Sequence, residues 1–227
     1  DIVSTLKPAQ ILAFTATAGE RTLEDIRKCL FVRKPLVVRG DSDRENIYYS
    51  AFKAADREAG LYSILAVCPK PALVFCRSRP QTLMLCIKGR RLMRETEQRY
   101  YHAGLTREER ETIENWYNNS ENGILYSTNA YGMGVDKSNI RTVIHFTLPA
   151  TAEEYLQESG RAGRDGKQSY AFALITDHPA QAVKSATADE SVKDSLAEIV
   201  IKPGCRRNGL LAMLGNYLNW DLRVRVI

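Results

Sequence analysis

The sequence predicts an α/β protein: a parallel β-sheet with helices on both faces, followed by a small helical C-terminal segment. Short aliphatic or β-branched runs alternate with segments of helical periodicity from about residue 35 to residue 177, which is typical of a parallel sheet with helical connections. Most of these runs are apolar throughout, as expected of strands that helices cover on both faces. Beyond about residue 179 the pattern becomes helical.

Seven runs are expected to form strands, at residues 10–15, 35–39, 72–76, 98–102, 123–127, 142–146 and 169–175. A threonine three positions before an acidic residue marks a helix start, because the two side chains can cap the first turn reciprocally. This pattern occurs at Thr106 with Glu109 and at Thr151 with Glu154, and more weakly at Thr22 with Asp25. Two C-terminal helices are expected at about 179–200 and 206–219, separated by Lys-Pro-Gly at 202–204.

The composition is that of a globular protein: 227 residues, 44% of them hydrophobic and 26% charged. These values exclude a largely disordered, collagen-like or disulfide-dense chain, and no apolar run approaches the length of a membrane span. The net charge of +5 fits nucleic acid or another acidic partner, and it fits many enzymes as well. Five irregularly spaced cysteines without a CxxC pair indicate a reducing, intracellular compartment.

The strongest local motif is QESGRAGRDG at 157–166, at the end of a capped helix and before a strand. Arg161 and Arg164 are three positions apart with small residues between them, so both guanidinium groups can reach one acceptor. A phosphate is the natural acceptor for such a pair. A glycine-rich helix end with solvated arginines explains the string about equally well when it is taken alone.

Three other polar segments follow predicted strands. The loop STNAYGMGVDKSNI at 127–140 can bring backbone close to a phosphate, although a plain turn between strand and helix is a slightly better explanation of it alone. Arg77 and Ser78 follow another strand, at the edge where open α/β sheets bind ligands, and a solvated basic turn is the alternative. His102 follows a third strand and precedes a helix, although a lone histidine more often packs or hydrogen-bonds.

In order along the chain, five strings resemble motifs III, IV, V and VI of superfamily-two helicases: TAT at 15–17, VFCRSR at 74–79, YHAG at 101–104, TNAYGMGVDK at 128–137 and QESGRAGRDG at 157–166. The contiguous stretch from 132 to 166 is similar to the signature of the RecQ family. This resemblance covers about residues 8–178 and extends weakly to CRRNGLLAMLG at 205–215.

The resemblance implies a RecA-like parallel sheet and three segments. Residues 1–34 would be the tail of a first RecA-like domain, residues 35–178 a second RecA-like domain, and residues 179–227 a helical segment that can begin a truncated zinc-binding module. Because the chain opens at Asp1 without a methionine, we expect it to be a piece of a longer protein. Cys205 matches the first zinc ligand of the family, but no further cysteine follows it, so a zinc site is expected only in a longer chain.

The family's activity would make this an ATP-dependent DNA helicase, moving 3′ to 5′ and unwinding duplexes in DNA repair or recombination. ATP and Mg²⁺ would be held mainly by the first domain, whose Walker A lysine and acidic box do not occur in this chain. The expected partners are single-stranded and duplex DNA and the N-terminal RecA-like domain of the same protein, with no membrane. The compartment would be the cytoplasm in a bacterium or the nucleus in a eukaryote.

The resemblance also assigns roles to individual residues. Arg164 would be the arginine finger at the γ-phosphate of ATP, with Arg161 and Gln157 beside it. Residues that couple the nucleotide to DNA would be Thr15, Thr17, Gly134 and Asp136, and contacts to the DNA backbone would come from Arg77, Ser78, His102, Thr128 and Lys137. Two alternatives stay open: an RNA-directed motor of the same superfamily, and a non-catalytic nucleic-acid-binding module that keeps half of a motor fold.

Overall fold

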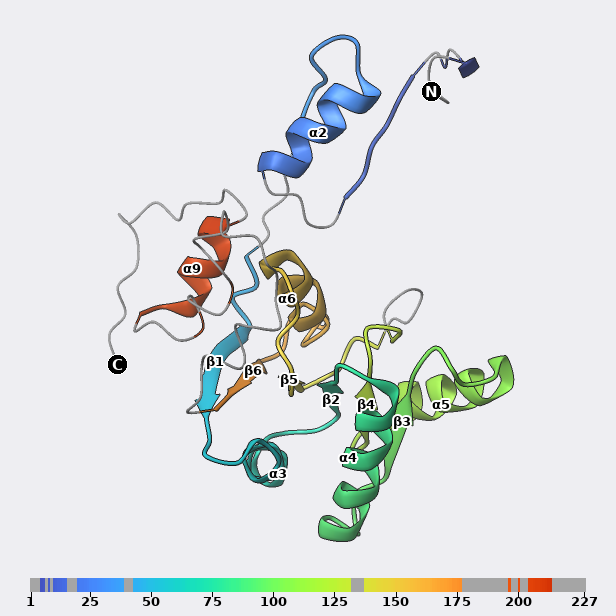
Figure 1. Cartoon of the computed structure of the whole chain (residues 1–227), viewed down its shortest axis with the longest axis vertical. Coiled ribbons are helices and arrows are strands. Elements are labelled where there is room, and N and C mark those ends of the chain that lie inside the picture. Colours follow the sequence, from blue (N-terminus) through green and yellow to red (C-terminus); the bar gives the residue numbers. More distant parts are fainter. Residues whose placement is uncertain are drawn as a thin grey trace.

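A computed structural model describes residues 5–6, 8, 10–15, 20–38, 43–131, 137–176, 196, 200 and 204–213. Its centre is a six-stranded sheet in the order β1-β6-β5-β2-β4-β3, in which every pair of neighbours is parallel (Figure 1). The strands are β1 (Ile47–Lys53), β2 (Ala72–Phe75), β3 (Gln98–Tyr101), β4 (Ile124–Ser127), β5 (Thr142–His145) and β6 (Ser169–Ile175). The predicted fold class is therefore confirmed.

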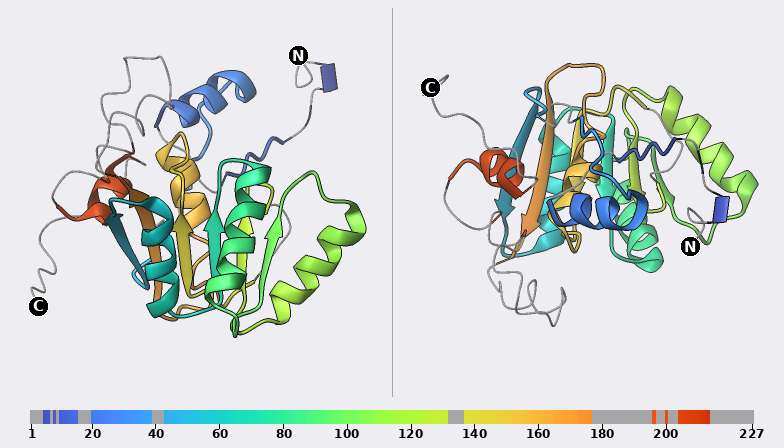
Figure 2. Two further views of the ribbon diagram at one scale, coloured as in Figure 1. Left: turned by 60° about the horizontal axis from the view of Figure 1, so that its bottom comes forward. Right: turned by 90° about the horizontal axis from the view of Figure 1, so that it is seen from above.

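Helices cover both faces of the sheet. On one face, α3 (Arg57–Val67) and α4 (Arg79–Leu92) pack against Val74, Ile144 and Leu174, and Figure 2 shows these two helices on the same side of the strands. On the other face, α5 (Arg107–Asn119) contributes Tyr117 to a second core with Phe75. Towards β1, α6 (Ala152–Ser159) and α9 (Arg206–Met213) enclose a third cluster.

Five of the seven predicted strands are present, and the other two are not. Residues 10–15 and 34–38 have no regular secondary structure, and apolar side chains such as Phe14 and Leu36 are exposed there. Strand β1 was not predicted; it lies at the edge of the sheet and pairs only with β6. The choice between residues 35–39 and 47–53 depends on pairing with a strand more than 100 positions away, which local composition does not reveal.

The predicted helix starts are confirmed at Thr106 and Thr151. Thr106 and Glu109 form a reciprocal capping box at the start of α5. Thr151 accepts a hydrogen bond from the backbone of Glu154, whose carboxylate accepts from the backbone of Ala150 instead of from Thr151. Thr22 is not a cap, because it lies inside α2, which spans Glu20–Leu30.

The C-terminal part of the chain is described only in places. α9 confirms the start of the predicted helix at 206–219, and residues 214–219 lie outside the described part. Most of the predicted helix at 179–200 also lies outside it, but Leu196 and Val200 are helical and pack into the cluster with α6 and α9. Among the described residues, no helix is both long and apolar enough to span a membrane.

Gly89→Ala is expected to destabilise the protein, although alanine favours helices more than glycine by about 1 kcal/mol. Gly89 lies in α4 against the buried hydrogen bond from Tyr126 Oη to Gln98 Oε1. A Cβ at this position would lie 2.2 Å from Gln98 Oε1 and 2.4 Å from Tyr126 Oη. Overpacking of this kind costs about 1–3 kcal/mol, so urea unfolding should show a lower midpoint, and a higher midpoint would contradict this packing.

Candidate functional site

Three loops with predicted contact residues lie side by side at the carboxyl edge of the sheet. β2, β4 and β3 are neighbours in that order, and Ser127 is in register with both Phe75 and Tyr101. Backbone hydrogen bonds continue past the strand ends, from Cys76 N to Ser127 O at 2.7 Å and from Thr128 N to Tyr101 O at 3.3 Å. The residues that follow these ends therefore form one row: Arg77 with Ser78, then Thr128, then His102.

The row presents hydrogen-bond donors. Ser78 Oγ caps α4 by accepting from Gln81 N, and Thr128 Oγ1 accepts from Ala130 N, so each hydroxyl retains its own hydrogen to donate. His102 Nδ1 accepts from Gly104 N at 3.2 Å, which leaves Nε2 as the ring donor. The Arg77 side chain is exposed. Hydroxyl, imidazole and guanidinium donors without a carboxylate among them suit phosphate oxygens.

Lys137, the fifth predicted contact residue, does not join this row. Its side chain is only 4% exposed, and Nζ donates to Asn118 O at 3.1 Å and to Ser120 O at 2.7 Å, at the C-terminal end of α5. The ammonium group also lies 5.2 Å from the centre of the Tyr117 ring. Lys137 thus caps a helix, where a cation meets carbonyls that have no partner within the helix.

The two arginines of QESGRAGRDG lie in the loop between α6 and β6, at the amino edge of the sheet. Gly163 N donates to Ile140 O at 2.8 Å and Asp165 N donates to Ser138 O at 3.2 Å, just before β5 begins. Arg164 is exposed in this loop, and Gln157, seven positions earlier, is exposed on α6. This segment is therefore at the opposite edge of the sheet from the row of donors.

Arg161 is buried, with 8% of its surface exposed. Within the described part of the chain, its Nε and the hydroxyl of Tyr131 have no hydrogen-bond partner. Burial, together with the nearby charge of Arg164, lowers the pKa of the Arg161 guanidinium. A buried polar group without a partner costs free energy, so this pair of donors favours an anion as a ligand.

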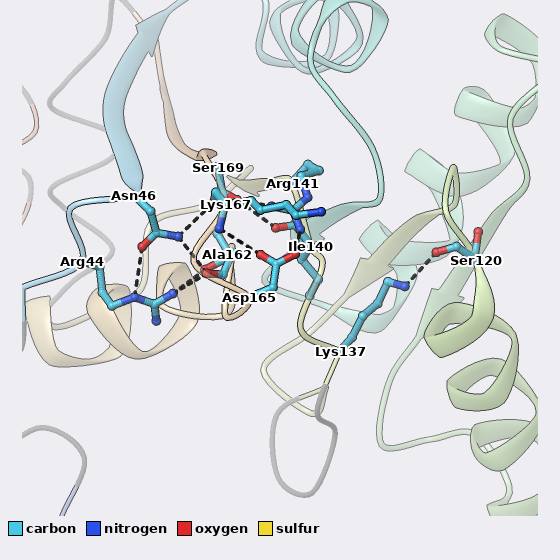
Figure 3. A network of polar contacts seen from close by, with 11 residues as sticks. Arg44, Asn46, Ser120, Lys137, Ile140, Arg141, Ala162, Asp165, Lys167 and Ser169 are labelled. Atoms are coloured by element: carbon cyan, nitrogen blue, oxygen red, sulfur yellow. Dashed lines mark hydrogen bonds and ion pairs between the residues drawn. The ribbon is translucent and has the colours of Figure 1, made fainter.

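The loop that bears both arginines, residues 160–167, is called the arginine loop, and two residues that were not predicted as site residues hold it. Arg44 donates to Gly160 O, Ala162 O and Gly163 O at 3.2, 3.0 and 2.8 Å, as Figure 3 shows in part. Asn46 Nδ2 donates to Gly163 O at 2.8 Å and to Lys167 O at 2.9 Å. No motif marks these two residues, because their partners are more than 110 positions away.

The loop also closes on its other side. Arg141 pairs with Asp165 and donates to Ser169 Oγ at 3.2 Å (Figure 3). Gly163 has a φ of +53°, and an added Cβ would lie 2.5 Å from both Asn46 Nδ2 and Ser169 Oγ. Glycine is therefore required at this position for both conformation and space.

A buried contact connects α6 to β2, the strand that leads to Arg77. His145 on β5 has no exposed surface, and its Nε2 lies 3.0 Å from Glu158 Oε2 on α6. The imidazole stacks on Phe75 at 5.3 Å between ring centroids and lies 4.5 Å from the Tyr155 ring. Phe75 is the last residue of β2, and Glu158 is three positions before Arg161.

Comparison with known proteins gives the family. Residues 59–166 match the helicase conserved C-terminal domain. Over 169 residues the chain is 37% identical to the probable ATP-dependent DNA helicase RecS of Bacillus subtilis, and over 158 residues it is 37% identical to the ATP-dependent DNA helicase RecQ of Pasteurella multocida. The chain belongs to the RecQ family of helicases.

These alignments cover most of this RecQ-family chain and a small part of each relative. The alignment with RecS covers 72% of this chain and 34% of RecS, and that with RecQ covers 69% and 25%. The ATP-dependent DNA helicase hus2/rqh1 of Schizosaccharomyces pombe is 32% identical over 224 residues, which are 92% of this chain and 17% of that protein. The chain thus spans between 17% and 34% of the length of these curated relatives.

Solved structures share the fold of this RecQ-family chain. Saccharomyces cerevisiae Dbp5, bound to RNA and ADP BeF3, matches with a TM-score of 0.60 and 20% identity, over 81% of this chain and 50% of that one. A DEAD box protein of Methanococcus jannaschii matches with a TM-score of 0.55 and 22% identity, over 74% of this chain and 46% of that one. At these identities the likeness shows the fold alone.

Some residues assigned from the RecQ resemblance cannot be placed in this site. Thr17, Gly134 and Asp136 lie outside the described residues, and Thr15 is in the irregular segment at 10–15. Cys205 is exposed directly before α9. Across the described ranges, no three His, Cys, Asp or Glu side chains are grouped as metal ligands would be.

Lys137→Met is expected to change how stability depends on pH. Burial lowers the pKa of the Lys137 ammonium to about 8, whereas a lysine in an unfolded chain titrates near pH ~10.4. Between these values the unfolded chain binds more protons than the folded one, so this residue makes the free energy of unfolding rise with pH. Urea unfolding from pH 7.5 to 10 should show a steeper rise for wild type than for Lys137→Met.

The matched control is Lys88→Met, at an exposed lysine that pairs with Glu58 at 2.6 Å. This variant should follow the wild-type pH profile more closely than Lys137→Met does. Identical slopes for wild type and Lys137→Met would show that the lysine is not buried as a cation.

Proposed function

We propose that this chain is the second motor domain of an ATP-dependent DNA helicase of the RecQ type, which moves 3′ to 5′ along a single strand and unwinds duplexes. The observation that carries the proposal is the loop at 160–167, which holds the buried guanidinium of Arg161 and the exposed one of Arg164. A site of this kind can receive a phosphate that another domain presents. Residues 35–178 would form this domain, and residues 1–34 would belong to the first motor domain.

The residues of the loop fit the nucleotide. ATP would supply the phosphoanhydride bond whose hydrolysis drives movement, with Mg²⁺ and the triphosphate held mainly by the first domain. Arg161 offers an Nε without a partner among the described residues, which matches an anionic oxygen. Arg164 is exposed, so it can reach across an interdomain cleft and donate to the γ-phosphate, where negative charge develops. Gln157, exposed on α6, faces solvent near this loop and would assist.

The row formed by Arg77, Ser78, Thr128 and His102 would hold the sugar-phosphate backbone of the strand. Its hydroxyl, imidazole and guanidinium donors recognise phosphate without reading bases, as a translocating motor requires. Because the row and the arginine loop lie at opposite edges of the sheet, closure of the cleft on ATP and its reopening after hydrolysis would change the grip on DNA. Thr15, Thr17, Gly134 and Asp136 would couple the two events.

Arg164→Ala, in a chain that carries both motor domains, is expected to lower kcat by about 10³-fold or more, because a finger stabilises charge that exists only in the transition state. Affinities for ATP and DNA should stay within a few fold. Arg164→Lys should restore little activity, since an ammonium cannot make the two parallel bonds of a guanidinium. Steady-state ATPase assays with saturating DNA measure these effects.

The 227-residue chain by itself provides the baseline for that assay, because we expect it to hydrolyse no ATP. If Arg164→Ala keeps near-normal turnover and Arg161→Ala loses it, Arg161 is the finger. If both variants keep turnover, the loop has no part in hydrolysis and the proposed mechanism is wrong. Stimulation of the two-domain ATPase by RNA in preference to DNA would identify an RNA-directed motor instead.

We also expect the isolated chain to bind single-stranded DNA weakly, without sequence preference and with an affinity that falls steeply as salt rises. Contacts to phosphates release counterions, and each contact adds about −0.7 to the slope of log K against log salt for a single strand. Fluorescence anisotropy with labelled oligonucleotides of different sequence measures this slope. Thr128→Val together with Ser78→Ala should weaken binding equally for all sequences, and salt-independent or sequence-selective binding would contradict the backbone contacts.

A further inference from the structure

Two residues just before strand β1, Arg44 and Asn46, hydrogen-bond to the backbone of the arginine loop. We propose that Arg44 and Asn46 are positioning residues for hydrolysis, which aim Arg161 and Arg164 by fixing the peptide group directly before each of them. This inference rests on the proposed function and names two further residues that the reaction needs. Neither residue would touch the nucleotide.

The contacts of Arg44 select one backbone path for the loop. Its guanidinium donates to the carbonyls of Gly160, Ala162 and Gly163. The Gly160 and Gly163 carbonyls belong to the peptide groups directly before Arg161 and Arg164, and the Ala162 carbonyl belongs to the peptide group between Ala162 and Gly163. Three carbonyls can converge on one side chain only if the loop turns tightly around it. The positive φ of Gly163 provides that turn.

Asn46 extends the same hold to the far end of the loop. Its amide group donates to Gly163 O and Lys167 O, so the two ends of the segment 163–167 are joined through one side chain. Arg164 lies inside this segment and Arg161 lies just before it. The side chain of Asn46 is itself oriented by Arg44, because Arg44 Nε lies 3.4 Å from Asn46 Oδ1 (Figure 3).

The charge of Arg44 suits its place. The Gly160 carbonyl is at the C-terminal end of α6, where carbonyls lack partners within the helix and the helix dipole favours a cation. Hydrogen bonds from a charged donor are stronger than neutral ones. A lysine at this position keeps the charge, but a single ammonium cannot reproduce the planar fork that spans three carbonyls.

The residues that bind the loop are also connected to the C-terminal segment. Asp43, the neighbour of Arg44, forms a two-bond ion pair with Arg207 of α9. α9 packs with Val200, Ala152 and Tyr155 in the cluster beside β1. The residues before β1 are therefore fixed between α9 on one side and the arginine loop on the other, which limits how far Arg44 can shift.

Positioning matters because catalytic groups act over short distances. A displacement of about 1 Å in a reacting group can cost about 10²-fold in rate. Loosening the loop would leave both arginines present but misdirected. The cost would therefore appear in kcat and leave the binding of ATP and DNA nearly unchanged.

The test uses Arg44→Lys and Asn46→Asp in a chain that carries both motor domains. Asn46→Asp keeps the shape of the side chain and replaces the donor with a carboxylate that faces two carbonyls. Both variants should lower kcat of the DNA-stimulated ATPase by up to about 10²-fold, with KM for ATP and the Kd for single-stranded DNA within a few fold of wild type. Arg94→Lys is the matched control, at an exposed arginine after α4, towards the other end of the sheet, and should behave as wild type.

A double-mutant comparison separates positioning from a loss of folded protein. If Arg44 acts through the arginines, Arg44→Lys should cost much less in the Arg164→Ala background than in wild type. An equal cost in both backgrounds, or a fall in kcat that follows a fall in Tm, would mean a purely structural role and would overturn the inference. Normal kcat in both Arg44→Lys and Asn46→Asp would also overturn the inference, provided that Arg164→Ala loses turnover. If Arg164→Ala and Arg161→Ala both keep turnover, the proposed function itself is wrong.

Discussion

Parallel pairing of all six strands decides where each functional segment of this chain lies. In a parallel sheet every strand starts at one edge and ends at the other. The residues that follow β2, β3 and β4 therefore meet at the carboxyl edge, and the segments that precede β1, β5 and β6 meet at the amino edge. The row of Arg77, Ser78, Thr128 and His102 and the arginine loop are separated by the length of the strands, so any communication between them has to cross the sheet.

A buried contact connects the end of β2 to α6, the helix that leads into the arginine loop. His145 lies within the central strands, touches Phe75 at the end of β2, and reaches Glu158 on the helix that leads into the arginine loop. An imidazole serves here because it can stack on an aromatic ring and hydrogen-bond to a carboxylate at the same time. The His145 side of the contact is fully buried, so a shift of α6 relative to β2 would have to break it.

Three arginines near the amino edge of the sheet differ in their contacts and burial, and therefore in what each can bind. Arg44 directs its donors at backbone carbonyls. Arg161 is buried beside Tyr131, with an Nε that has no partner in the described part of the chain. Arg164 is at the surface. The sequence places Arg161 and Arg164 in one motif and leaves Arg44 unmarked, although the three groups form one arrangement in space.

Several features follow from local sequence, because apolar runs and capping side chains act over a few residues. They are the α/β class, the five strands β2 to β6, the caps at Thr106 and Thr151, and the motifs at the strand ends. Other features depend on partners distant in the chain. Residues 47–53, not 35–39, form the first strand because β6 pairs with them. Lys137 points inward because its ammonium group caps the end of α5. Arg44 and Asn46 hold the arginine loop, which lies more than 110 positions away in the sequence. Tertiary structure decided these features, since hydrogen-bonding groups take their role from the neighbours that folding brings to them.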